Sequence, residues 1–277
     1  MKKTNTKLVI AGSTIETFQY LDKPLFYGYP SHIRNRTRCG IDVSNERGRL
    51  RKIETRKRSA HRSAMLLRRL INANAWQWKT PEEKPYTPVF ATFTFKEDIR
   101  DMGKANACYS RFIRRLNYVL LGGVRRCHLK YVSILEFQDK YRQGVIHFHT
   151  VFFNLDPNVI KTLSETWGHG FVDAKPIDEA INVGRYMIKF IYSCFEDGRM
   201  DGHKRYFSSK DLLQPIEIRE QVAASSIVAQ IPAKYLTAEN DYEGKLGTVR
   251  CKQFMLPDNE TINDILPEIK DQLNYSQ

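Results

Sequence analysis

The stretch Gly144-Val-Ile-His-Phe-His-Thr-Val-Phe-Phe153 holds the pattern from which the fold of this chain can be worked out. Aromatic and β-branched residues fill it, which predicts a β-strand, and the one-residue spacing puts His147 and His149 on the same face of that strand. Apolar residues surround the two histidines on both faces. We therefore expect a strand buried on both sides that carries a pair of polar side chains.

Two interpretations of this histidine pair are open. Neighbouring imidazoles on one face compete for protons, because two like charges so close together disfavour each other. A divalent cation bound by two neutral imidazoles removes this conflict. The alternative is a pair of core histidines whose polar atoms are satisfied by backbone carbonyls or water. Spacing alone leaves both interpretations standing.

Composition restricts the class of protein. The 277 residues include 44 Lys and Arg against 31 Asp and Glu, which gives a formal net charge of +13 and points to a polyanionic partner, nucleic acid before a membrane surface. No window approaches the roughly 20 apolar residues of a membrane span. The five cysteines are scattered and suggest neither a disulfide framework nor a zinc finger. We expect a cytoplasmic protein without a membrane partner.

The changes in composition predict three regions: a basic region over 1–84, a central domain over 85–215 and an extension of unknown role over 216–277. A long amphipathic helix is expected between 45 and 80, where eleven Lys and Arg stand against two Glu. Such an excess favours binding of a phosphate backbone, and a solvated basic face is the alternative. The candidate DNA-binding residues of this helix are Arg51, Lys52, Arg56, Arg58 and Arg62.

The central region predicts an α+β fold, with a central antiparallel sheet and helices packed against it. The strand over 130–138 and the strand that carries the histidines are separated by a short polar turn, so we expect them to form an antiparallel hairpin. The other predicted elements are strands over 89–95 and 170–174 and helices over 99–120, from 157 to 168, and over 178–194.

This hairpin can supply a third metal ligand. Glu136 and Gln138 point to one side of their strand, and an antiparallel return can place that side beside the histidine pair. An unpaired carboxylate is costly in so apolar a setting, and two imidazoles with one carboxylate suit Mn²⁺ or Mg²⁺. A register shift of two residues would exchange Glu136 and Gln138, so both stay candidates.

A candidate nucleophile lies on the following helix. Tyr186 and Lys189 are three residues apart and share a helix face, and a nearby cation favours the phenoxide form of a tyrosine. The alternative is a core tyrosine beside a lysine that reaches solvent. Farther on, Lys204, Arg205 and Tyr206 combine cations with a ring, which suits single-stranded nucleic acid, although an ordinary surface hairpin is equally compatible.

Three motifs taken in order resemble those of a known family. Phe90-Ala-Thr-Phe-Thr-Phe95, Glu136 with Ile146-His-Phe-His149, and Tyr186-Met-Ile-Lys189 are similar to the three motifs of HUH endonucleases. The resemblance runs from Val89 to Lys189 and on toward Pro215. It is closest to the single-tyrosine replication initiators of plasmids and filamentous-phage-like elements. Their third motif often ends in a further tyrosine, where this chain has Phe190.

The resemblance implies an RRM- or ferredoxin-like nuclease domain that starts rolling-circle replication in the cytoplasm of a bacterial host. Tyr186 would attack single-stranded origin DNA, forming a 5′-phosphotyrosine and a 3′-hydroxyl primer, and would later rejoin the strand. Lys189 would be its electrostatic partner, and His147, His149 and Glu136 would hold Mn²⁺ or Mg²⁺.

The implied partners are origin DNA, as a single strand and also as a duplex, with host helicase and polymerase, since no Walker motif is present. A relaxase or single-tyrosine transposase of the same chemistry and a non-catalytic nucleic-acid-binding protein are the alternatives.

Overall fold

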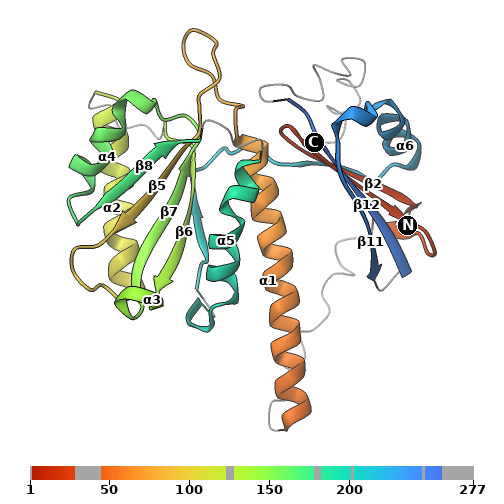
Figure 1. Ribbon diagram of the computed structural model, residues 1–277, viewed down its shortest axis with the longest axis horizontal. Helices are drawn as coiled ribbons and strands as arrows, with labels where there is room; N and C mark the ends of the chain where they lie inside the picture. The colour runs from red at the N-terminus through yellow and green to blue at the C-terminus, as the bar shows by residue number, and fades with distance from the viewer. Residues whose placement is uncertain are drawn as a thin grey trace. The chain divides into compact units, whose positions relative to one another are not determined.

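The computed structural model describes residues 2–28, 45–122, 128–177, 182–200, 203–244 and 247–257. The chain forms two compact units. Unit 1 combines Met1–Arg56 with Gln214–Gln277, and unit 2 is Lys57–Leu213. Each unit contains a five-stranded sheet whose pairings are all antiparallel, together with helices (Figure 1). The predicted α+β class is confirmed.

The sheet of unit 2 carries the histidine pair on its central strand. Its order is β8-β5-β7-β6-β9. The strands are β5 (Val89–Thr94), β6 (Tyr131–Gln138), β7 (Val145–Phe152), β8 (Val172–Pro176) and β9 (Tyr206–Ser208). Every residue of β7 is buried, as the apolar pattern on both faces predicted. The expected hairpin of β6 and β7 is confirmed, with the short α3 (Asp139–Arg142) inside its turn.

Helices cover both faces of this sheet (Figure 1). On one face lie α2 (Met102–Leu120) and α4 (Ile160–Trp167), which follows the short 3₁₀ helix η2 (Pro157–Val159). On the other face lies α5 (Val183–Glu196), followed by η3 (Gly198–Met200). The predicted helices of this region are therefore present. Residues 178–181, where the last of them was expected to begin, lie outside the described residues.

The core on the α2 side of the sheet is aromatic. Phe93 of β5 packs between Phe112 of α2 and Trp167 of α4, with ring centroids 4.7 and 5.3 Å away. The buried Tyr109 hydroxyl shares a hydrogen bond of 2.8 Å with Thr150 of β7. Burial of such rings supplies much of the stability of a domain, so this layer fixes the back of the sheet.

The long helix α1 (Glu46–Asn74) packs its second half into the core of unit 2. Its apolar positions there are Ala60, Ala64, Leu67 and Ile71. Its neighbour is the start of α5, where the Gly184 amide donates to Asn72 Oδ1 at 2.7 Å. A Cβ at Gly184 would lie 2.6 Å from the Arg68 carbonyl oxygen. Glycine at this position therefore permits the close approach of α5 to α1.

Unit 1 is built from both ends of the chain. Its sheet has the order β10-β2-β3-β12-β11. The strands are β2 (Thr6–Ala11), β3 (Thr14–Tyr20), β10 (Ile216–Ile218), β11 (Leu236–Gly244) and β12 (Gly247–Met255). Two short strands, β1 (Lys2–Thr4) and β4 (Leu25–Tyr27), pair separately. Helix α6 (Gln221–Gln230) packs its buried Ala224 and Ile227 against this sheet, and η4 (Ala233–Tyr235) follows it.

These units differ from the three regions expected from composition. The predicted boundary after residue 84 falls inside unit 2, because the apolar stripe of α1 joins the core of unit 2. The predicted extension over 216–277 is not separate, since β10 pairs with β2 and β12 pairs with β3. Pairing between strands so far apart in the chain leaves no local trace in composition. The acidic stretch over 258–277 lies outside the described residues.

Candidate functional site on the α5 face of the sheet

Strand register decides which side chains meet the histidine pair. Glu136 of β6 lies directly opposite His147 of β7, and Thr92 of β5 lies opposite His149 on the other side. Residues that face each other across an antiparallel pair point to the same face of the sheet. Both histidines, Glu136 and Thr92 therefore belong to the face that α5 covers. Gln138 lies one step further along β6, opposite Val145.

The His149 ring is held on every side. Its Nε2 lies 2.6 Å from Glu136 Oε2, and its Nδ1 lies 3.1 Å from Thr92 Oγ1. Phe190 of α5 stacks on it at a centroid distance of 3.9 Å, and Phe90 of β5 lies parallel to it at 5.9 Å. Rings and hydrogen bonds together fix the orientation of the imidazole, which is the usual preparation for a functional histidine.

His147 has a different environment. It is buried, yet its Nε2 has no hydrogen-bond partner among the described residues. Burial, with the charge of His149, lowers the pKa of His147 to about 4. The neutral imidazole, which is the form that binds metals, is therefore favoured at neutral pH. The Gln138 Oε1 atom is also buried without a partner among the described residues, and buried polar atoms of this kind call for an explanation.

Glu136 is ionised in this setting. Burial raises the pKa of its carboxyl group, but the hydrogen bond and charge of His149 outweigh that effect, with help from Ser193 of α5, and the pKa is lowered overall. A carboxylate that is charged at neutral pH thus stands among one fixed imidazole, one unpartnered imidazole and the helix above them.

The residues fit a divalent metal ion in the kind of donor atom that they offer. Two imidazoles, a carboxylate and the amide oxygen of Gln138 are ligands that Mn²⁺ accepts, and the unpartnered Nε2 of His147 is available for coordination. However, no group of three His, Cys, Asp or Glu in the described part of the chain is already arranged to hold a metal. The hydrogen bond between His149 and Glu136 occupies two of the donors.

Helix α5 brings the candidate nucleophile to the same face. The Tyr186 ring meets the edge of Phe90 at a centroid distance of 5.1 Å, and Phe90 in turn lies against His149. The Lys189 ammonium lies 4.6 Å from the centre of the Phe190 ring. Within the described residues, neither Tyr186 nor Lys189 makes a side-chain hydrogen bond. The aromatic cluster of Phe90 and Phe190 therefore separates Tyr186 from the histidines.

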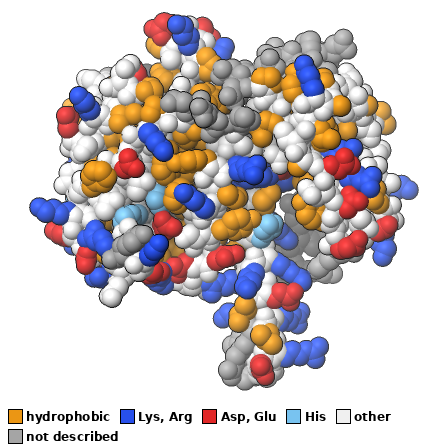
Figure 2. All heavy atoms as spheres, viewed as in Figure 1, with side chains coloured by type: hydrophobic (Ala, Val, Ile, Leu, Met, Phe, Trp, Pro, Cys, Tyr) orange, Lys and Arg blue, Asp and Glu red, His pale blue; other side chains and the backbone are white. Residues whose placement is uncertain are grey.

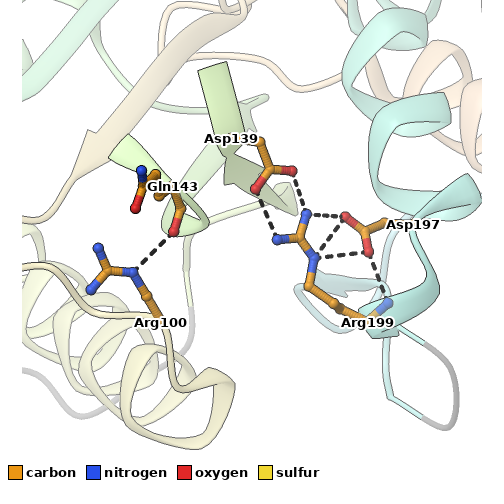
Figure 3. A network of polar contacts seen from close by, with 5 residues as sticks. All are labelled: Arg100, Asp139, Gln143, Asp197 and Arg199. Atoms are coloured by element: carbon orange, nitrogen blue, oxygen red, sulfur yellow. Dashed lines mark hydrogen bonds and ion pairs between the residues drawn. The ribbon is translucent and has the colours of Figure 1, made fainter. Parts of the chain in front are cut away.

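A polar network fixes the end of α5 to the hairpin that carries the site (Figure 3). Arg199, just beyond α5, donates to both oxygens of Asp139 at 2.9 and 2.5 Å, and it also contacts Asp197. Its guanidinium lies 4.0 Å from the centre of the Phe137 ring. On the other side of the turn, Arg100 donates to the Gln143 carbonyl at 3.0 Å. This network holds the turn between Glu136 and His147.

The candidate DNA-binding residues fall into two groups. On α1, Arg51, Lys52, Arg58 and Arg62 are exposed, and Arg56 is half-buried. Figure 2 shows Lys and Arg along this helix with hydrophobic side chains between them, in agreement with the exposure of Leu50 and Ile53.

The second group lies beside β9. Lys204 is exposed, Arg205 faces the Phe195 ring and Tyr206 pairs with Ile134, which puts Tyr206 on the face of the histidine pair.

Several residues of this site are not singled out by the sequence. Thr92 reads only as a strand residue, although it bonds to His149. Phe190 reads only as a departure from a family motif, although it stacks on His149. Arg199 gives no signal, since its partners lie in another element. The spacing of Thr92 within its strand could have placed it on the correct face, but not opposite His149.

Comparison with known proteins bears on this part of the chain. A family model for replication-associated proteins of the ORF2 type matches residues 88–193. The matched range contains β5, β6, β7 and most of α5, with the histidine pair, Glu136 and Tyr186. No curated protein and no solved structure matches the chain. The similarity supports a role in starting DNA replication, with DNA as the partner.

One further property bears on location. No helix in the described ranges combines the length and apolar composition that crossing a membrane requires.

Proposed function

We propose that this protein initiates rolling-circle replication by nicking single-stranded origin DNA through a tyrosine. The observation that carries the proposal is the placement of His147, His149 and Glu136 on one face of the sheet that α5 covers with Tyr186. All four residues lie within the range that is similar to replication-associated proteins.

In the proposed reaction, the Tyr186 oxygen attacks the scissile phosphorus. A bond forms between this oxygen and phosphorus, the bond from phosphorus to the 3′ oxygen breaks, the phenol loses its proton and the 3′ oxygen gains one. The products are a 5′-phosphotyrosine and a 3′ hydroxyl that can prime synthesis. Attack by a 3′ hydroxyl on the phosphotyrosine reverses the exchange and rejoins the strand. Lys189 adds positive charge near the anion, since its ammonium lies on the same helix.

A divalent metal ion would be held by His147, His149 and Glu136, with Gln138 as the alternative oxygen ligand, and when bound it would supply Lewis-acid polarisation of the phosphate. The chain's own contribution is to keep the two imidazoles neutral and oriented. Thr92 and Phe190 hold the His149 ring, and burial keeps His147 neutral. For His149 to take part, its bond to Glu136 must give way to the shared ion.

DNA is held in this proposal by the basic residues of α1 and by Lys204, Arg205 and Tyr206. The exposed cations suit phosphates, and Tyr206 offers a ring on the face of the histidine pair. Origin duplex is the partner proposed for α1, and host helicase and polymerase would act after the nick. A relaxase or single-tyrosine transposase would use the same chemistry and would differ in the DNA that it cleaves.

A second candidate function is non-catalytic binding of nucleic acid. The observation in its favour is that His149 is already satisfied by Glu136 and Thr92, as a structural histidine would be.

The experiment that separates the two functions uses labelled single-stranded origin DNA with Mn²⁺ and with EDTA. The proposal expects a covalent adduct that survives boiling in detergent and that needs the metal. Tyr186→Phe should abolish the adduct. Tyr192→Phe is the matched control on the same helix, because the Tyr192 hydroxyl is engaged by His61 Nδ1 at 3.0 Å.

His147→Ala should lose cleavage and keep DNA binding. An adduct with Tyr186→Phe would show that the nucleophile is wrong. Absence of any adduct with the wild type on every nickable strand, together with normal DNA binding, would favour the second candidate.

A further inference from the structure

We propose that a groove between α2 and α4 is a second binding site for single-stranded DNA, on the opposite face of the unit 2 sheet from the histidine pair. The groove has a volume of about 840 Å³, which lies in the range of known ligand sites. Its lining residues are Arg111, Arg114, Arg115, Tyr118 and Val119 of α2 and Thr162, Glu165 and Thr166 of α4.

The groove is distinct from the candidate site because the sheet stands between them. Helix α2 packs through Tyr109 against Phe148 and Thr150. These two side chains point away from the face that carries His147 and His149, since neighbouring residues of a strand alternate between faces. Binding in the groove therefore does not require the histidine pair, and the inference does not depend on strand cleavage.

Positive charge in the groove comes from one face of one helix. Arg111, Arg114, Arg115 and Tyr118 follow the spacing i, i+3, i+4 and i+7, so their side chains line up along α2. All four are exposed. Among the residues that line the groove, Glu165 is the one carboxylate. Three guanidinium groups against one carboxylate leave a net attraction for an anion.

The three arginines are not equivalent. Arg115 donates to the carbonyls of Thr166 and Trp167 at 2.9 and 3.2 Å, where it holds the end of α4. Arg111 donates only to Cys108 Sγ at 3.3 Å, a weak acceptor. Arg114 makes no hydrogen bond or ion pair with any described residue. Arg111 and Arg114 thus keep most of their planar sets of donors, which match phosphate oxygens.

A nucleic acid fits this chemistry better than other anions because the groove also offers rings and hydroxyls. The Tyr118 side chain is 52% exposed and Val119 is 53% exposed. An exposed ring beside guanidinium groups is the arrangement on which bases stack while phosphates meet cations. The hydroxyls of Thr162 and Thr166 add hydrogen-bonding groups on the opposite wall.

The neighbouring His169 agrees with a positive field at this place. Burial lowers the pKa of His169, and the charges of Arg115 and Arg111 lower it further. A positive potential that reaches the next element also attracts the strand from solution.

The test measures binding of a fluorescein-labelled oligothymidylate by anisotropy, in EDTA and across a range of salt concentrations. The double variant Arg111→Gln/Arg114→Gln leaves Arg115 in place to hold α4. Losing two phosphate contacts should reduce the slope of log K against log salt by about 1.4. Tyr118→Ala should weaken binding by about fivefold or more, the loss expected for one stacked base.

The matched control is Lys79→Gln/Lys104→Gln, which removes two exposed cations of unit 2 that are paired with Glu83 and Glu97, outside the groove. It should change the slope by less than half as much. Circular dichroism verifies that each variant is folded. His147→Ala should lose cleavage and yet keep the groove's share of binding, so a failure of the proposed function and a failure of this site can be told apart.

Three results would overturn the proposal. The first is a groove variant that binds like the control. The second is a polyglutamate peptide that competes as well as the oligonucleotide, which would make the groove a site for acidic peptides. The third is photo-crosslinking of a bromodeoxyuridine strand that labels no peptide of α2 or α4. Labelling of Tyr118 in the wild type and its loss in the double variant would support the site.

Discussion

Replacement of Arg199 by glutamine tests whether the network in Figure 3 holds the hairpin of the candidate site against the end of α5. The change removes the two-bond contact with Asp139 and the contact with the Phe137 ring. The Arg199 side chain is 43% exposed and that of Asp139 is 62% exposed, so the ion pair must be discounted for screening by solvent, to about 0.5–1 kcal/mol.

The ring contact adds about 0.5–1 kcal/mol, for a total of about 1–2 kcal/mol. For a protein of this size, that loss lowers the melting temperature by about 2–8 °C.

The pH dependence gives a sharper signature. Hydrogen bonding to Arg199 lowers the pKa of Asp139 in the folded protein. Stability from this pair is therefore present above the unfolded pKa of about 3.9 and is lost as the pH falls through the lower folded value. Melting curves of the wild type and Arg199→Gln should differ at pH 7 and converge in strong acid.

Lys104→Gln, which removes a largely exposed ion pair with Glu97 at 3.6 Å, is the control and should melt like the wild type. If Arg199→Gln melts like this control at pH 7, the network does not hold the hairpin. If its deficit is the same at every pH, the ion pair is not its cause.

Three further predictions concern the unit 2 sheet. Because the pKa of His147 is lowered to about 4, the unfolded chain takes up its proton first, so stability should fall by up to about 3 kcal/mol as the pH drops from 6.5 to 4; His147→Leu should show a smaller fall in urea unfolding. Tyr109→Phe deletes the buried hydroxyl that bonds to Thr150 and should cost about 1–2 kcal/mol in the same assay, with no change in the slope against urea. Gly170→Ala should destabilise by more than about 2 kcal/mol, since Gly170 has φ of +154° and a Cβ would lie 2.3 Å from the Thr94 carbonyl oxygen; soluble expression with an unchanged melting temperature would contradict this.

Local patterns in the sequence were enough to predict most of unit 2. The alternation around His147 and His149 identified a strand buried on both faces, and the short polar segment before it identified the hairpin with β6. The apolar stripes of α1, α2 and α5 identified three helices. Each of these features depends on residues within a few positions of one another, where the geometry of a strand or helix directly fixes which side chains share a face.

The tertiary structure decided what lies beside these elements. Register put Glu136, and not Gln138, opposite His147. Packing of α5 put Phe190 on His149 and separated Tyr186 from the histidines. None of these contacts follows from spacing, because each depends on how two elements that are distant in sequence slide past one another.

Unit 1 shows the same limit at a larger scale. Its sheet joins β2 and β3 near the start of the chain to β10 and β12 beyond residue 215. Composition separated these segments into two regions, since a short strand looks the same whether its partner is near or far. The sequence by itself determined the elements of unit 2 and the face that bears its two histidines. Only folding determined their partners, because strand pairing and side-chain packing select among many registers that local propensity leaves nearly equal in energy.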